Sequence, residues 1–144
     1  GYLEKELKQY VEKIGLNNSV HFMGYSNKIN EDICKAALFV MSSDHEGMPN
    51  ALMEAMAMGL PCISTNSTGG GASFLIQNGQ NGVLVQRGNV EELSAAMLKV
   101  LSDNAYAESL AENAKKIRYT LSSEKVYSQW ESLAVYLSIK FRTL

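Results

Sequence analysis

The sequence predicts an α/β domain with a doubly wound parallel sheet and a helical C-terminal tail. Short apolar runs alternate with segments of helical periodicity, which is the pattern of consecutive βαβ units. Nine of the eleven glycines and both prolines lie between Gly24 and Gly88, and neither residue type occurs after Gly88. A loop-rich centre is therefore followed by a continuous helical end. The 144 residues are enough for one domain with its own apolar core and leave no room for a second full domain.

The helices are predicted from the spacing of apolar residues. From residue 3 to residue 14 such residues recur at helical intervals, and Gly15 stands where a helix would end. Asn89, with Glu92 three residues later, resembles a capping box at the start of another helix. The predicted helices are residues 2–14, 29–37, 50–58, 89–101, 105–119 and 123–139.

Two of these helices are expected to bury a defined face. The helix at 29–37 would turn Ile33, Ala36 and Ala37 inward. The tail helix carries one apolar stripe, which is expected to pack on this domain or to reach toward a further one. That stripe consists of Val126, Trp130, Leu133, Ala134 and Leu137.

The strands are predicted from apolar runs that turn residues interrupt. Residues 38–42 form a continuous apolar run that ends in a serine, which is typical of a strand buried on both faces of a parallel sheet. Residues 20–24 form a short alternating run, in which His21 is expected to be structural. The predicted strands are residues 20–24, 38–42, 61–65 and 82–86.

Charge, hydropathy and cysteine usage exclude several classes of protein. Thirteen Lys and Arg against fifteen Asp and Glu give a net charge of −2, without the clustered cations that duplex nucleic acid requires. The longest apolar stretches, such as residues 36–41, are far shorter than the roughly 20 residues of a membrane span. The first residues have no signal-peptide pattern, and Cys34 and Cys62 are expected to be buried free thiols. We therefore expect a cytoplasmic protein.

The loop after the run at 38–42 carries the clearest indication of function. Ligands of doubly wound sheets bind beyond the carboxyl ends of the strands, and residues 42–50 occupy such a position. This loop leads directly into the helix at 50–58, whose first N–H groups and partial positive charge suit a phosphate or sugar hydroxyls. Gly47 permits a ligand to approach the backbone closely, and Pro49 stiffens the chain before the helix.

Two glutamates flank the start of this helix. Glu46 lies in the loop, and Glu54 lies about one turn into the helix. The pair can therefore hold two different parts of an elongated ligand rich in hydroxyl groups, such as a nucleoside diphosphate sugar. From the residues alone, the alternative is that both carboxylates merely stabilise the positive end of a helix.

Three segments carry recognisable motifs. Residues 46–65 read EGMPNALMEAMAMGLPCIST, residues 20–25 read VHFMGY, and residues 78–85 read NGQNGVLV. These resemble the E-x7-E signature with its following strand, the V-x-F-x-G-Y segment and the N-G-x-N-G-x-L-V turn of retaining GT-B glycosyltransferases. The resemblance is to the group that transfers sugars from nucleotide-sugar donors in glycan, capsule and lipopolysaccharide assembly. It implies that residues 1–144 are part of a Rossmann-like, nucleotide-sugar-binding C-terminal domain, truncated at its N-terminus.

This resemblance implies roles for individual residues. Glu46 would bind hydroxyls of the donor sugar at the catalytic centre, and Glu54 would accept hydrogen bonds from the ribose. The donor-binding residues would be Glu46, Gly47, Met48, Asn50, Ala51 and Glu54, and the nucleobase loop would be Gly24, Tyr25 and Ser26. The family implies no cofactor and no metal ion. The nucleotide sugar is a substrate, and its own phosphate and the positioned amides would stabilise the charge that develops.

The sequence departs from the family pattern in two ways. Phe74 stands where the family often has a glutamate, and the glycines at 69–71 form either a close approach to the ligand or simply a turn. The Arg and Lys that bind the diphosphate in the family precede the segment seen here, as does the N-terminal domain that binds the acceptor glycan or lipid-linked sugar. We therefore expect this chain alone to be inactive.

The same residues leave two other functions open. One alternative is a GT-B sugar epimerase of the UDP-N-acetylglucosamine 2-epimerase type, and another is a non-catalytic nucleotide- or protein-binding α/β module. His45 beside Glu46 is expected to be a hydrogen-bonding or solvated residue. An open sheet edge at 38–42 would favour self-association, and the whole protein is expected in the cytoplasm, with the inner face of a membrane as a further location.

Overall fold

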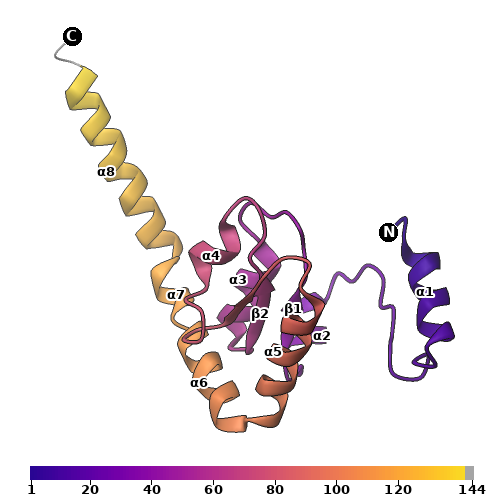
Figure 1. Cartoon of the computed structure of the whole chain (residues 1–144). Coiled ribbons are helices and arrows are strands. Elements are labelled where there is room, and N and C mark those ends of the chain that lie inside the picture. Colours follow the sequence, from indigo (N-terminus) through magenta and orange to yellow (C-terminus); the bar gives the residue numbers. More distant parts are fainter. Residues whose placement is uncertain (142–144) are drawn as a thin grey trace.

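The chain folds around a small parallel sheet with helices on both faces (Figure 1). The structure is a computed structural model and describes residues 1–141, apart from the side chain of Asn30. The strands, which all pair in parallel and lie in chain order, are β1 (Phe39–Met41), β2 (Cys62–Thr65) and β3 (Val83–Val85). The helices are α1 (Glu4–Lys13), α2 (Ile29–Ile33), α3 (Asn50–Met58), α4 (Gly71–Leu75), α5 (Val90–Ser102), α6 (Asn104–Ala114), α7 (Ile117–Thr120) and α8 (Ser123–Phe141).

Strand β2 is the centre of the sheet and contributes to two apolar cores. Val40 of β1 lies opposite Ile63, and Ile63 lies opposite Val83 of β3. Cys62 belongs to the cluster that α3 covers, whereas Ile63 belongs to the cluster that α5 covers. Because successive side chains of a strand point to opposite faces, these clusters lie on the two faces of the sheet. Helices on both faces of a parallel sheet confirm the predicted α/β fold.

Helix α3 is predicted correctly to the residue, because local sequence signals fix both of its ends. Pro49 precedes it in an extended conformation. Gly59 ends it with a φ of +81°, in the left-handed region that favours glycine. The buried residues of α3 are Leu52, Ala55 and Met56. Glu54 lies on the exposed side of the same helix.

The start of α5 follows the predicted cap only in part. The Asn89 side-chain oxygen accepts a hydrogen bond from the Glu92 N–H at 3.0 Å, as an N-cap should. The Glu92 carboxylate accepts from the Gln86 N–H at 2.7 Å instead of returning to Asn89. It therefore fixes the end of β3 to α5 rather than completing a capping box.

The prediction of a strand at 20–24 is wrong. Residues 20–25 have no regular secondary structure, and no strand in the described part of the chain lies beside them. A strand needs a neighbour to pair its N–H and C=O groups, and an alternating pattern does not supply one. Figure 1 shows this segment connecting the body of the domain to α1, which lies apart from the body and has no buried residue.

Two further predictions for this half of the chain need correction. The helix expected at 29–37 ends at Ile33, so Ala36 and Ala37 are exposed instead of inward. Cys34 is also exposed, and its thiol donates to the Glu31 carbonyl at 3.2 Å. Only Cys62 is buried as expected.

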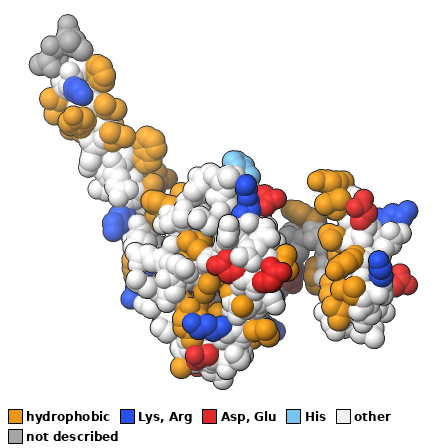
Figure 2. Space-filling view, viewed as in Figure 1, with side chains coloured by type: hydrophobic (Ala, Val, Ile, Leu, Met, Phe, Trp, Pro, Cys, Tyr) orange, Lys and Arg blue, Asp and Glu red, His pale blue; other side chains and the backbone are white. Residues whose placement is uncertain are grey.

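The C-terminal helices also differ from the prediction. The helix expected at 105–119 is interrupted at Lys115–Lys116, where the chain bends so that Ile117 of α7 packs against the α3 core. No residue of α8 is buried within residues 1–141, and Trp130 is 66% exposed, so the predicted stripe is not part of the core, although Val126 near its start is half-buried. The other expectation, that the stripe reaches toward a further domain, stays a prediction. Figures 1 and 2 show α8 projecting from the body with apolar side chains along it. None of the described helices combines the length and apolar character that a membrane span needs.

The buried Cys62 gives a prediction about pH. Burial raises the pKa of its thiol from 9.0 to about 12. Above pH 9.0 the unfolded chain releases a proton that the folded chain keeps, so the free energy of unfolding should fall by up to about 1.4 kcal/mol per pH unit until about pH 12. Urea unfolding at a series of pH values should show this fall, and Cys62→Ala should reduce it. Cys34→Ala is the control, and an equal reduction in both variants would contradict the assignment to Cys62.

Candidate functional site

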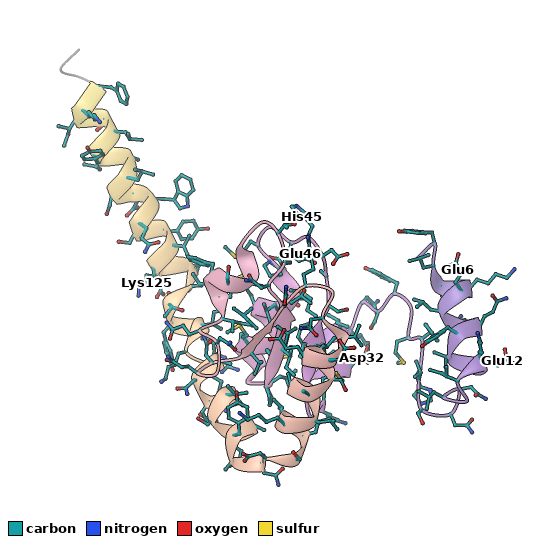
Figure 3. The ribbon with its side chains drawn as sticks, in the orientation of Figure 1. Glu6, Glu12, Asp32, His45, Glu46 and Lys125 are labelled. Carbon is teal, nitrogen blue, oxygen red and sulfur yellow. The ribbon has the colours of Figure 1, made fainter. Side chains whose placement is uncertain are left out.

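The loops that follow β1 and β2 meet at the carboxyl edge of the sheet. The Glu46 N–H donates to the Thr68 carbonyl at 3.0 Å, and the Thr68 N–H donates to the Asp44 carbonyl at 3.1 Å. His45 Nδ1 lies 2.8 Å from the Thr68 hydroxyl oxygen. Figure 3 shows His45 and Glu46 at this end of the domain. His45 is thus a hydrogen-bonding residue, and Thr68 is its partner, which the sequence alone did not identify.

The glycines at 69–71 allow these two loops to touch. A Cβ atom on Gly71 would overlap the Gly47 carbonyl oxygen and lie 2.7 Å from Cδ of Pro49. A Cβ atom on Gly69 would overlap the Glu46 carbonyl oxygen. These glycines therefore allow close contact with residues 46–49, whereas their predicted close approach to a ligand stays a prediction.

The start of α3 presents unpaired polar groups beside this contact. No side chain caps α3, and its first intrahelical bond runs from the Met53 N–H to the Pro49 carbonyl at 3.1 Å. The amides of Asn50 and Ala51 thus have no hydrogen-bond partner among the described residues, and both residues are exposed. Met48, just before the helix, is 51% exposed.

The two glutamates of the predicted site are available to a ligand. Glu46 is half-buried in the loop, and Glu54 is exposed one turn into α3. Neither carboxylate has an ion pair or a side-chain hydrogen bond within residues 1–141. Their oxygens can therefore accept hydrogen bonds from hydroxyl groups, next to amides that can donate to anionic oxygens.

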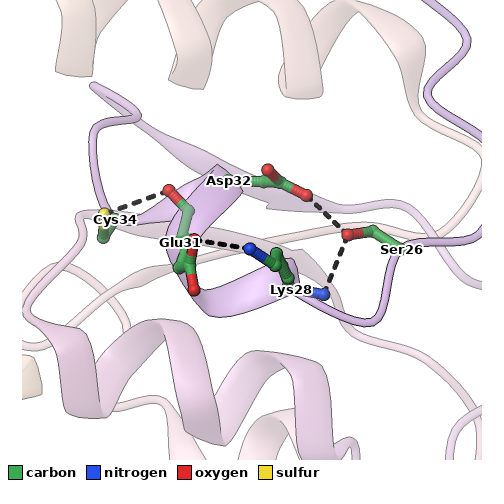
Figure 4. Close-up of polar contacts among 5 residues, drawn as sticks. All are labelled: Ser26, Lys28, Glu31, Asp32 and Cys34. Carbon is green, nitrogen blue, oxygen red and sulfur yellow. Dashed lines mark hydrogen bonds and ion pairs between the residues drawn. The ribbon is translucent and has the colours of Figure 1, made fainter.

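The predicted nucleobase loop is held by α2 (Figure 4). The Ser26 hydroxyl donates to the Asp32 carboxylate at 2.7 Å and accepts from the Lys28 N–H at 3.0 Å. Gly24 has a φ of +67°, and Tyr25 is 95% exposed. No hydrogen bond in the described part of the chain joins this loop to residues 42–50.

Phe74 lies at a pocket to which none of the predicted donor-binding residues contributes. Phe74 is 67% exposed and lines a pocket of about 570 Å³ between α4 and α6, and Lys116 is another of its lining residues. Among residues 1–141, no three His, Cys, Asp or Glu side chains are grouped so that they could hold a metal ion.

Comparison with known proteins identifies the family of this chain. The family model of glycosyl transferases group 1 matches residues 1–117. An exopolysaccharide phosphotransferase of Streptomyces coelicolor is 31% identical over 128 residues, which are 88% of this chain and 14% of that protein. An N-acetyl-alpha-D-glucosaminyl L-malate synthase of Bacillus anthracis is 30% identical over 126 residues, which are 87% of this chain and 32% of that protein.

A solved structure has the same fold. The crystal structure of HepE from Anabaena in complex with UDP-glucose superposes with a TM-score of 0.80 and 29% identity, over 93% of this chain and 36% of that one. The chain thus spans about a third of the length of this relative and of the Bacillus anthracis synthase, and a smaller part of the Streptomyces coelicolor protein.

Proposed function

Because the chain belongs to the glycosyl transferases group 1 family, we propose that it forms the nucleotide-sugar-binding part of a retaining glycosyltransferase. The whole protein would transfer a hexosyl group to a glycan, lipid-linked or polysaccharide acceptor. The observation that carries the proposal is the pairing of two free carboxylates, Glu46 and Glu54, with the uncapped start of α3. The UDP-glucose bound to the Anabaena protein supports a nucleotide sugar as the ligand. The family match favours this function over the epimerase and the non-catalytic module.

In this proposal the site holds the donor by its two ends. Glu54 accepts hydrogen bonds from the ribose hydroxyls, and Glu46 accepts from hydroxyls of the sugar. The amides of Gly47, Met48, Asn50 and Ala51 donate to sugar hydroxyls and to the diphosphate. As the bond between the sugar and the phosphate breaks, its electron pair stays on the diphosphate oxygen, and these amides stabilise that charge without a metal ion.

The nucleobase would be bound by residues 24–26. Ser26 is already bonded to Asp32, so contacts from residues 24–26 to a base would come mainly from the backbone and from the exposed ring of Tyr25. The acceptor would be bound by another part of the whole protein, and we expect no sugar transfer by this chain alone.

Titration of the chain with UDP-glucose, GDP-mannose and ADP-glucose tests the proposal. At millimolar donor, at least one of them should shift the backbone amide resonances of Gly47, Asn50 and Ala51 in ¹H–¹⁵N NMR spectra. Glu54→Gln should weaken binding by about 10- to 100-fold, because hydrogen bonds to a charged group contribute about 1.5–3 kcal/mol.

The control is Glu91→Gln, which neutralises an exposed carboxylate in the first turn of α5. It should bind the donor as the unmodified chain does. Equal binding by Glu54→Gln, or no response at residues 47–51 to any of the three donors, would contradict the proposal.

A further inference from the structure

A polar groove of about 530 Å³ lies between the loops that follow β2 and β3. We propose that it binds an anionic carbohydrate, meaning a sugar that carries a carboxylate or a phosphate group. Its volume falls within the roughly 300–1,000 Å³ of small-molecule sites. None of the residues assigned to the nucleotide sugar lines it, so the site is additional to the proposed donor site.

Arg87 gives the groove its positive charge. Its side chain is exposed, has no ion pair within residues 1–141, and has one long contact, from Nη1 to the Asp44 carbonyl oxygen at 3.5 Å. That contact holds the guanidinium beside the 42–50 loop and leaves most of its N–H groups free. A planar guanidinium pairs with a carboxylate or a phosphate through two parallel hydrogen bonds, so an anionic group is the ligand that it suits best.

Neutral hydrogen-bonding groups complete the binding surface. The side-chain amides of Asn66 and Gln86 have no partner in the described part of the chain. Their backbones are fixed, because the Asn66 N–H donates to the Val85 carbonyl at 2.8 Å and the Gln86 N–H donates to Glu92 at 2.7 Å. Two side-chain amides that have free donors and acceptors and extend from fixed backbones suit the adjacent hydroxyls of a sugar ring.

One wall of the groove is apolar. Leu84 is half-buried there. Its N–H donates to the Asn78 side-chain oxygen at 3.0 Å, and this bond holds the backbone of Leu84 in place. A sugar ring can lay its C–H face on such a surface while its hydroxyls and its anionic group point to the polar side. A simple inorganic ion would leave this wall and the two amides unused, so the groove fits a sugar that carries the charge.

The test is a ¹H–¹⁵N NMR titration with glucuronate, glucose 6-phosphate, glucose and inorganic phosphate. We expect glucuronate, glucose 6-phosphate or both to shift the side-chain signals of Asn66, Gln86 and Arg87 at millimolar concentration. Glucose should bind at least about tenfold more weakly. Arg87→Gln should weaken binding by at least about tenfold. Arg87→Lys should bind more tightly than Arg87→Gln but more weakly than the unmodified chain, because lysine keeps the positive charge but lacks the planar pair of N–H donors.

Two control variants make the result specific. Lys116→Gln removes an exposed cation at another pocket and should bind like the unmodified chain. Glu54→Gln should also bind the anionic sugar normally, even though it loses the nucleotide sugar. Unchanged binding by Arg87→Gln, equal binding of glucose, or inorganic phosphate binding as tightly as glucose 6-phosphate would overturn the proposal. Loss of binding in Glu54→Gln would place the sugar in the donor site and would also overturn it.

Discussion

We expect Gly71→Ala to destabilise the protein by about 3 kcal/mol, near the upper end of the usual cost of overpacking. The added Cβ atom would overlap the Gly47 carbonyl oxygen and lie 2.7 Å from Cδ of Pro49. Both obstacles belong to the chain before α3, and neither can rotate away as the end of a flexible side chain would. The loops after β1 and β2 must therefore separate, even though alanine improves the helix propensity of α4 by up to about 1 kcal/mol.

Gly47→Ala is the matched control for this substitution. No atom lies within 4 Å of a Cβ built on Gly47, and its φ is not in the left-handed region, so its free energy of unfolding should stay close to that of the unmodified chain. Urea unfolding of both variants measures the difference. If Gly71→Ala unfolded at the same urea concentration as Gly47→Ala, the close contact between the two loops would be disproved.

The same pair separates stability from binding. The open space in front of Gly47 is where the proposed donor would approach the backbone. Gly47→Ala should therefore weaken nucleotide-sugar binding in the titration described above while leaving the fold intact. Of these two variants, only Gly71→Ala is expected to lower both stability and binding.

Elements with local signals at both ends were predictable from the sequence. Pro49 and Gly59 enclose α3, and the apolar runs on either side of it gave β1 and β2. The segment at 20–24 has an equally good local pattern, but no strand of the described residues lies beside it. Its secondary structure depends on a neighbour, which an apolar pattern cannot reveal. The bend at Lys115–Lys116 likewise follows from the packing of Ile117 on α3, and no glycine or proline marks it.

The candidate site was predictable to a similar degree. Residues 46–54 are contiguous, so their motif can be recognised in the sequence. The partners of this segment and of the loop before it follow other strands: Thr68, after β2, binds the backbone of Asp44 and Glu46, and Arg87, after β3, reaches Asp44. The register of the parallel sheet brings these residues to one edge. The register of the sheet cannot be derived from a sequence pattern. The roles of single polar residues after a strand, such as Thr68 and Arg87, therefore become clear only from the structure.

Leu52→Ala is expected to cost about 3–5 kcal/mol, which is a large share of the stability of a small domain. Leu52 has no exposed surface and lies in the cluster between α3 and the sheet, where Met56 and Cys62 are also fully buried. Truncation removes apolar contacts and leaves a cavity, because α3 is held at both ends and cannot move in to fill it.

The control is Met48→Ala, which removes a side chain that is 51% exposed and should cost less than about 1 kcal/mol. Thermal or urea unfolding measures both values. Leu52 lies between Ala51, which contributes an amide to the proposed site, and Glu54, so loosening α3 should also weaken nucleotide-sugar binding. Adding urea below the unfolding transition should widen that loss for Leu52→Ala and not for Met48→Ala. A Leu52→Ala variant as stable as Met48→Ala would mean that α3 does not rest on the sheet through this residue.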